Sequence, residues 1–300
     1  MDRVAAARQP IDTRGALTMA AVCACWSLQH IAIKLAAADM TPVMQVGVRS
    51  ALAGLLVWAE MTRRRIRVSP RDPTLVPGAA IGVLFAGTFL CVGVGLSLTS
   101  ASRTMVSLYS APLFTAIGLH LLVPEERLSR LQWAGAALAF AGLAVALHSG
   151  EEASGEAAAS SAVGDLAALA AGVLWGATTV VIRTTTLAST PAIKTLLYQL
   201  VGAGLLVTAF AVATHQGVVE RLTPRLGASQ AFQVVVVGFA SFLAWFSMLR
   251  KYLASRLSVM AYMTPVFGAV FGALILGEHL DATFVTGAAL MLAGVLLVNR

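Results

Sequence analysis

The sequence predicts an all-α integral membrane protein with ten transmembrane helices, built as two inverted five-helix repeats with both termini in the cytoplasm. The first observation is composition: 58% of the 300 residues are hydrophobic, only 12% are charged, and the mean hydropathy is +0.82. Soluble domains carry about 25% charged residues, so an ordinary soluble fold is excluded. The other two observations are the spacing of the apolar runs and the distribution of the basic residues.

Ten apolar runs of roughly membrane-spanning length follow one another along the chain. A helix that rises 1.5 Å per residue needs about 20 apolar residues to cross roughly 30 Å of hydrocarbon. Ten such helices with short loops leave no room for a soluble catalytic domain. The first run is too long for a signal-peptide core, so we expect it in the mature protein. The runs cover residues 16–37, 42–61, 75–97, 104–122, 132–148, 162–182, 191–213, 229–249, 257–276 and 283–298.

The basic residues predict the orientation, because cytoplasmic loops are enriched in Lys and Arg. With the N-terminus inside, sixteen of the 21 basic residues fall in inside segments and three fall outside. The longest outside loop contains three Glu and no basic residue. The predicted organisation is a cytoplasmic tail at 1–15, a first repeat at 16–148, an acidic external loop at 149–161 and a second repeat at 162–300.

The two halves repeat each other in sequence. W-S-L-Q-H-I-A-I-K at 26–34 returns as W-G-A-T-T-V-V-I-R at 175–183, and G-A-A-L-A-F-A-G at 135–142 returns as G-A-A-L-M-L-A-G at 287–294. Each half has five spans, an odd number, so the second half enters the membrane from the opposite side. Inverted repeats are typical of secondary transporters, which bind substrate near the membrane midplane between the repeats.

A second set of shared features resembles a known family. A Trp is followed eight residues later by a base in each half, and Arg49 lies in the second span. The fourth span of each half has a mid-helix proline, Pro112 or Pro265, and a Glu at its end, Glu126 or Glu278. The chain resembles the EamA-type domain of the drug/metabolite transporter superfamily over nearly its whole length, twice. This resemblance implies ten helices with both termini inside, and among the members the chain is most similar to bacterial exporters of aromatic and other neutral amino acids.

One departure from the superfamily concerns coupling. The small multidrug exporters carry a membrane-embedded Glu in their first helix, whereas all fourteen acids of this chain lie in tails, loops or span ends. The sequence therefore favours a facilitative carrier, or one that depends on a histidine, over proton antiport through a buried carboxylate.

Aromatic and polar residues at matched places in the two halves are candidates for substrate binding. Trp26 and Trp175 would form walls for an apolar or aromatic substrate, with helix packing as the alternative. Different polar residues follow the two Trp residues, so the halves would present different groups to an asymmetric ligand. By depth, the candidates from the first half lie in the outer half of the membrane, those from the second half lie in the inner half, and Trp175 lies near the middle. The candidates are Trp26, Gln29, His30, Tyr109, Trp175, Thr178, Thr179 and Tyr262.

The two prolines are candidate hinges. A proline within a helix removes a hydrogen bond and displaces the carbonyl four residues earlier, and paired interrupted helices are a sequence indicator of a transporter site. Pro112 and Pro265 would free the carbonyls of Leu108 and Ala261. Tyr109 and Tyr262 each precede a proline by three residues, which would place a phenol beside the freed carbonyl.

His30, Lys34 and Arg49 lie within predicted spans, where ionisable groups are costly. His30 shares a helix face with Trp26 and Lys34, and the alternative to a site role is a hydrogen bond to a neighbouring helix. Lys34 is close to the outer end and can extend to the interface. Arg49 lies about 10 Å inside helix two and needs a partner from another helix or from the substrate.

The remaining features are interpreted as structural. Trp58, Trp133 and Trp245 lie near predicted inner ends and are interpreted as interfacial belt residues. The Gly/Ala-rich segments 135–142 and 287–294 fit close helix packing, either within one chain or in a homodimer. We expect contact with the lipid bilayer and no nucleic-acid partner, metal, cofactor or disulfide.

The sequence leaves three functions open. The first is a bacterial inner-membrane exporter of small neutral metabolites, mainly aromatic and other neutral amino acids, working by alternating access. The second is export of drugs or other small metabolites on the same scaffold. The third is an intramembrane enzyme, for which Ser27 and His30 offer a pair one helical turn apart but no third group.

Overall fold

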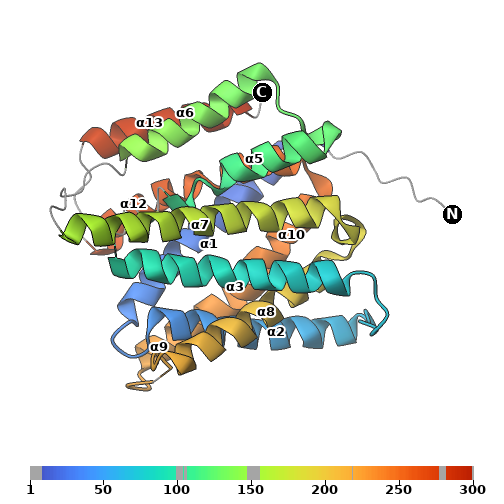
Figure 1. Cartoon of the computed structure of the whole chain (residues 1–300), viewed down its shortest axis with the longest axis vertical. Helices are drawn as coiled ribbons and strands as arrows, with labels where there is room; N and C mark the ends of the chain where they lie inside the picture. Colours follow the sequence, from blue (N-terminus) through green and yellow to red (C-terminus); the bar gives the residue numbers. More distant parts are fainter. Residues whose placement is uncertain are drawn as a thin grey trace.

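The structure, a computed structural model, describes residues 9–98, 104, 107–146, 156–217, 219–276 and 282–298, and it is mainly helical. Outside the helices, the described residues form two isolated β-bridges, Gln9 with Tyr252 and Met40 with Val219. The helices, drawn in Figure 1, are α1 (Thr13–Leu35), α2 (Pro42–Arg63), α3 (Leu75–Leu98), α5 (Ala111–Leu122), η1 (Pro124–Glu126), α6 (Arg130–Ala146), α7 (Glu156–Thr184), η2 (Thr186–Ser189), α8 (Ala192–Ala213), α9 (Pro224–Ala231), the π-helix η3 (Phe232–Ser241), α10 (Phe242–Lys251), α11 (Ala254–Met260), α12 (Met263–Leu276) and α13 (Ala282–Val298).

Seven helical stretches of the described chain are long and apolar enough to cross a membrane. Three shorter apolar helices, Ala111–Leu122, Arg130–Val145 and Val285–Val298, fall within or close to the remaining predicted runs. The prediction of an all-α membrane protein is confirmed, whereas ten complete crossings and their orientation stay predictions. The seven long stretches are Thr13–Leu35, Pro42–Arg63, Leu75–Gly95, Ala162–Thr184, Ala192–Ala213, Pro224–Lys251 and Ala254–Ile275.

The predicted loop at 149–161 is wrong in its second part. Helix α7 begins at Glu156, so residues 156–161 are helical. Their sequence, E-A-A-A-S-S, is rich in alanine, which has the highest intrinsic helix propensity. Residues 149–155 lie outside the described residues.

The fourth and ninth predicted spans are broken a few residues after their starts. The chain makes a turn at Tyr109 and Ser110 before α5, and again at Ala261 and Tyr262 before α12. The breaks occupy equivalent places in the two repeats. Each tyrosine therefore lies in the turn itself instead of along a continuous helix.

The prolines lie just after these breaks, which corrects their predicted mid-helix position. Pro112 is in the first turn of α5 and Pro265 in the first turn of α12. A missing N–H costs little there, because the first N–H groups of a helix have no intrahelical acceptor. The carbonyl of Ala261 accepts a hydrogen bond from the Thr264 amide at 2.9 Å, so it is not left free as predicted.

The sequence repeat reappears in the packing of α1 and α7. Cys23 of α1 lies against α11, with its Sγ 3.6 Å from the Met260 carbonyl oxygen. Gly172, which is 149 residues further along, is the equivalent residue of α7. A Cβ on Gly172 would lie 2.8 Å from the carbonyl oxygen of Ser107, the residue equivalent to Met260. The first helix of each repeat thus packs on the broken helix of the other repeat, and the contacts involve equivalent residues.

The Gly/Ala-rich segments of α6 and α13 pack on each other within the chain, at one edge of the molecule (Figure 1). A Cβ on Gly135 would lie 2.9 Å from the Gly294 carbonyl oxygen, and one on Gly142 would lie 2.4 Å from the Met291 amide nitrogen. Such distances require glycine, since helix backbones approach each other here. The small-residue faces that could have served a homodimer are therefore used inside one chain.

Among the described residues, four ion pairs connect segments that are distant in sequence. Each pair joins segments predicted to lie on the same side of the membrane. We name the two ends of the molecule after the predicted orientation. The inner end has three of the pairs and the outer end has one. The inner pairs are Asp12 with Lys251, Asp72 with Lys194 and Glu126 with Arg183, and the outer pair is Asp39 with Arg225.

The acidic groups of the loops are held in their charged form by these contacts. A hydrogen bond from Thr223, followed by one from Arg225, lowers the pKa of Asp39. Hydrogen bonds from Lys194 and Thr74 hold the pKa of Asp72 well below its usual range. Both carboxylates are therefore ionised near neutral pH.

Candidate functional site

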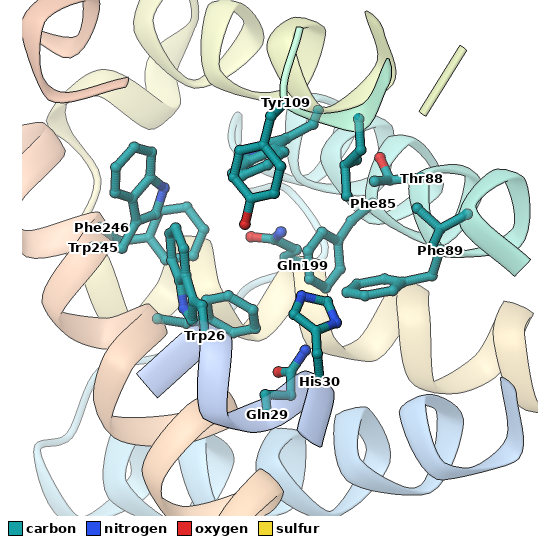
Figure 2. A pocket seen from close by; sticks show the side chains of 14 residues that line it. Trp26, Gln29, His30, Phe85, Thr88, Phe89, Tyr109, Gln199, Trp245 and Phe246 are labelled. Carbon is teal, nitrogen blue, oxygen red and sulfur yellow. The ribbon is translucent and has the colours of Figure 1, made fainter. Parts of the chain in front are cut away.

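Helices α1, α3, α7, α8 and α10 and the turn before α5 line a central cavity of about 90 Å³ (Figure 2). Among the described residues, its lining is mainly aromatic and aliphatic, with five neutral polar side chains and no acidic or permanently charged one. A concave apolar site with a few placed polar groups is the usual form of a small-molecule site. The lining residues are Trp26, Gln29, His30, Phe85, Thr88, Phe89, Val92, Leu108, Tyr109, Trp175, Gln199, Phe242, Trp245 and Phe246.

Trp26 is the centre of the aromatic wall. Its ring centroid lies 6.0 Å from that of Trp175, 5.6 Å from Trp245 and 5.9 Å from Phe242. Its indole N–H donates to the Ser241 hydroxyl at 3.1 Å, so this polar atom is already satisfied inside the protein. Trp26 therefore offers ring surface, rather than a hydrogen bond, to anything in the cavity.

Polar side chains point into the cavity from three of the elements that line it. Gln29 and His30 project from α1, and Tyr109 and Gln199 point toward the same space from the turn before α5 and from α8 (Figure 2). The buried Oε1 of Gln199 has no hydrogen-bond partner among the described residues. An unsatisfied buried acceptor is costly, so a donor from a ligand or water would stabilise it.

The structure brings five of the eight predicted binding residues together. Trp26, Gln29, His30, Tyr109 and Trp175 all line the cavity, as their predicted depths would allow. These residues come from both halves of the chain. The cavity is thus shared between the repeats.

The other three predicted binding residues lie outside the cavity lining. Thr178 and Thr179 are buried, and the Thr178 hydroxyl donates to the Leu174 carbonyl of its own helix at 2.9 Å. Tyr262 is completely buried, and its hydroxyl has no partner among the described residues. Thr178 and Thr179 follow Trp175 by three and four residues, so they lie on the same side of α7 but one turn further along it, beyond the cavity lining.

The predicted hinge and charged residues surround the cavity without lining it. Pro112 lies with Trp175, Trp245 and Ala261 around a small void of about 10 Å³, and Pro265 is buried. Lys34 is exposed at the end of α1. Arg49 is fully buried, and its Nη1 donates to the Gln29 Oε1 at 2.5 Å.

Trp245 was wrongly predicted as an interfacial belt residue. It is only 5% exposed and lines the cavity, whereas Trp58 is 61% exposed as expected for a belt position. Gln199 was also missed, although a single glutamine within the apolar run 191–213 is a signal that could have identified it. The contributions of Phe85, Phe89 and their neighbours on α3 left no such signal, because phenylalanine is common in any membrane span.

The inner end of the molecule is closed by a buried carboxylate. Glu126 and Arg183 form an ion pair, and both side chains are nearly inaccessible. Glu126 also accepts the backbone amides of Ala254 and Ser255, each at 3.1 Å, and the Ser255 hydroxyl at 2.9 Å. One carboxylate therefore joins η1, the end of α7 and the N-terminus of α11, where the helix dipole favours a negative charge.

Comparison with known proteins agrees with this two-part architecture. The EamA-like transporter family matches the chain twice, over residues 13–147 and 162–300. The chain belongs to the EamA-like transporter family. A solved crystal structure that is 21% identical superposes with a TM-score of 0.78 over 94% of this EamA-like transporter and 96% of that chain, and so shares its fold.

Relatives of this EamA-like transporter occur in enteric bacteria. A probable amino-acid metabolite efflux pump of Escherichia coli (strain K12) is 27% identical over 280 residues, covering 90% of this chain and 89% of the relative. A pump of the same name from Salmonella typhimurium (strain LT2) is 26% identical over 90% of this chain and 89% of its own. The uncharacterized inner membrane transporter YedA of E. coli (strain K12) is 31% identical over 43% of this chain and 42% of its own. The predicted family and the predicted multi-pass location in the bacterial inner membrane are confirmed.

Proposed function

We propose that this EamA-like transporter exports small neutral metabolites, chiefly aromatic and other neutral amino acids, by alternating access of its two repeats. The observation that carries the proposal is the lining of the central cavity, which combines a Trp-rich wall with neutral polar groups. An aromatic or aliphatic side chain would pack on Trp26 and Trp175, while Gln29, His30, Tyr109 and Gln199 would bind polar groups. Two relatives named as probable amino-acid metabolite efflux pumps support it.

The size of the cavity supports a cycle with large rearrangement. About 90 Å³ is well below the roughly 300–1,000 Å³ of typical ligand sites. A bulky amino acid therefore needs a state in which the repeats have moved apart. The Glu126 contacts to Arg183 and α11 would have to open when the cavity connects to the inner side.

Export of drugs or other metabolites is the alternative on the same scaffold. The described residues of the cavity lining include no carboxylate to attract the cationic groups that many drugs carry, which favours neutral cargo. The enzyme hypothesis finds no support in the Ser27–His30 pair, because the Ser27 hydroxyl donates to the Thr264 carbonyl oxygen.

Transport by purified protein in proteoliposomes tests the proposal. We expect labelled phenylalanine, tryptophan and leucine to equilibrate without an imposed ion gradient, because no carboxylate lines the cavity to carry a proton. Glutamate and lysine should enter at least about 10-fold more slowly, since an uncompensated charge in such a site costs several kcal/mol. Protein-free liposomes are the control. Preference for glutamate, lysine or a lipophilic cation such as tetraphenylphosphonium would contradict the proposal.

A further inference from the structure

Arg49 lies directly behind the wall of the cavity. Its guanidinium carbon is 5.0 Å from the centroid of the Phe89 ring and 5.9 Å from that of Phe242, and Nη1 donates to the Gln29 Oε1 at 2.5 Å. All three partners line the cavity. The side chain itself is 0% exposed. One layer of side chains therefore separates a positive charge from the space where a ligand would bind.

This charge has no anionic partner within the described chain. The Nε and Nη2 atoms of Arg49 are buried and make no hydrogen bond there. The two other buried bases that the structure describes each contact a carboxylate, Arg183 that of Glu126 and Lys194 that of Asp72. A guanidinium keeps its charge, and a buried charge without a counter-ion is unfavourable. Aromatic faces and one amide offset only part of that cost.

The hydrogen bond with Arg49 orients the side-chain amide of Gln29 in the cavity wall. Because the Gln29 Oε1 accepts from Arg49, the amide nitrogen of Gln29 remains as a donor on the cavity side, next to His30 (Figure 2). An anion placed there would meet N–H donors with a guanidinium behind them. Hydrogen bonds of this kind to a carboxylate are stronger than those between neutral groups.

We propose that Arg49 and Gln29 form a carboxylate subsite, and that the missing counter-ion of Arg49 is the carboxylate of the transported molecule. The inference rests on the proposed function. It narrows the proposed substrates to molecules that have a carboxylate and an apolar side chain. It also assigns Arg49 a role in specificity, because its field attracts carboxylates and repels amines that lack one.

Binding of two matched probes to the full-length protein in lipid nanodiscs tests this subsite. 3-Phenylpropionate has a carboxylate and no amine, whereas phenethylamine has an amine and no carboxylate. Quenching of the cavity tryptophans reports their binding. We expect wild type to bind 3-phenylpropionate at least about 10-fold more tightly than phenethylamine, since a charge pair within about 7 Å at an effective dielectric constant near 20 is worth this much or more.

Three variants distinguish the effect of the Arg49 charge on binding from an effect on folding. Arg49→Met should lower the affinity for 3-phenylpropionate about 10-fold or more and leave that for phenethylamine unchanged or improved. Gln29→Glu supplies an internal counter-ion, so it should remove the carboxylate preference even if Arg49→Met does not fold. Arg63→Met changes an exposed base on the same helix and should have no effect.

Equal binding of the two probes by wild type, no binding of either, or an unchanged preference in Gln29→Glu would each overturn the subsite. Phenylalanine transport without a carboxylate preference would leave the proposed function standing and remove only the subsite. Arg49-dependent binding of 3-phenylpropionate without amino-acid transport would support the subsite and contradict the proposed function.

Discussion

Replacing Glu126 with alanine is expected to lower the stability of the protein by about 3–5 kcal/mol, the usual effect of removing one partner from a buried ion pair. The substitution leaves Arg183 buried without its carboxylate. It also removes the acceptor of two backbone amides and one hydroxyl at the start of α11. Thermal unfolding of the detergent-solubilised protein would show this loss as a large fall in the transition midpoint.

Glu60→Ala is the matched control for this prediction. Glu60 pairs with Arg63 and Arg64, whose side chains are 72% and 51% exposed. Solvent-exposed pairs contribute about 0–1 kcal/mol, so its midpoint should hardly change. Replacing Glu126 and Arg183 together by Ala and Met should recover part of the loss, because the uncompensated charge is then absent. Equal shifts for Glu60→Ala and Glu126→Ala would contradict the account of a closed inner end.

Trp26→Ala is expected to reduce phenylalanine transport at least about 10-fold, because the indole ring contacts three other aromatic rings of the cavity wall. Removing a buried aromatic side chain also costs about 3–5 kcal/mol of stability. Trp26→Phe retains ring surface and should keep an intermediate activity. Initial rates of counterflow in proteoliposomes, divided by the amount of folded protein, separate transport from stability.

Trp58→Ala is the control for the cavity, because Trp58 is 61% exposed and does not line the central cavity. We expect its transport rate to stay near that of wild type. Equal losses in Trp26→Ala and Trp58→Ala would mean that the central cavity is not the substrate site.

The sequence predicted the helices and the repeat well, because both depend on features visible in a single chain. Long apolar runs leave few alternatives to membrane helices. The matching segments around Trp26 and Trp175 also indicated equivalent positions, and the contacts of Cys23 and Gly172 with the broken helices reproduce that equivalence.

Helix breaks were predicted less well. The mid-helix interpretation of Pro112 and Pro265 assumed a continuous helix, but the chain turns three residues earlier, at Tyr109 and Tyr262. Proline is well tolerated in a first helical turn, so the same residue is compatible with either geometry. Sequence alone could not choose between them.

Cavity membership depends on helix rotation, which sequence does not fix when a helix is apolar on all sides. Trp245 lies near a predicted span end, so depth suggested an interface, yet α10 turns it toward Trp26. Thr178 and Thr179 lie on the same side of α7 as Trp175, but one turn further along the helix, and they do not line the cavity.

The central claim is that the two repeats enter the membrane from opposite sides, since alternating access between inverted halves depends on it. Reporter fusions measure this directly: a fluorescent protein that matures only in the cytoplasm, and alkaline phosphatase, which is active only outside it. The account predicts that reporters inserted at 63–71 and fused after Arg300 are cytoplasmic, while one inserted at 151–160 is outside. A cytoplasmic reporter at 151–160 would contradict both the span count and the inverted repeat.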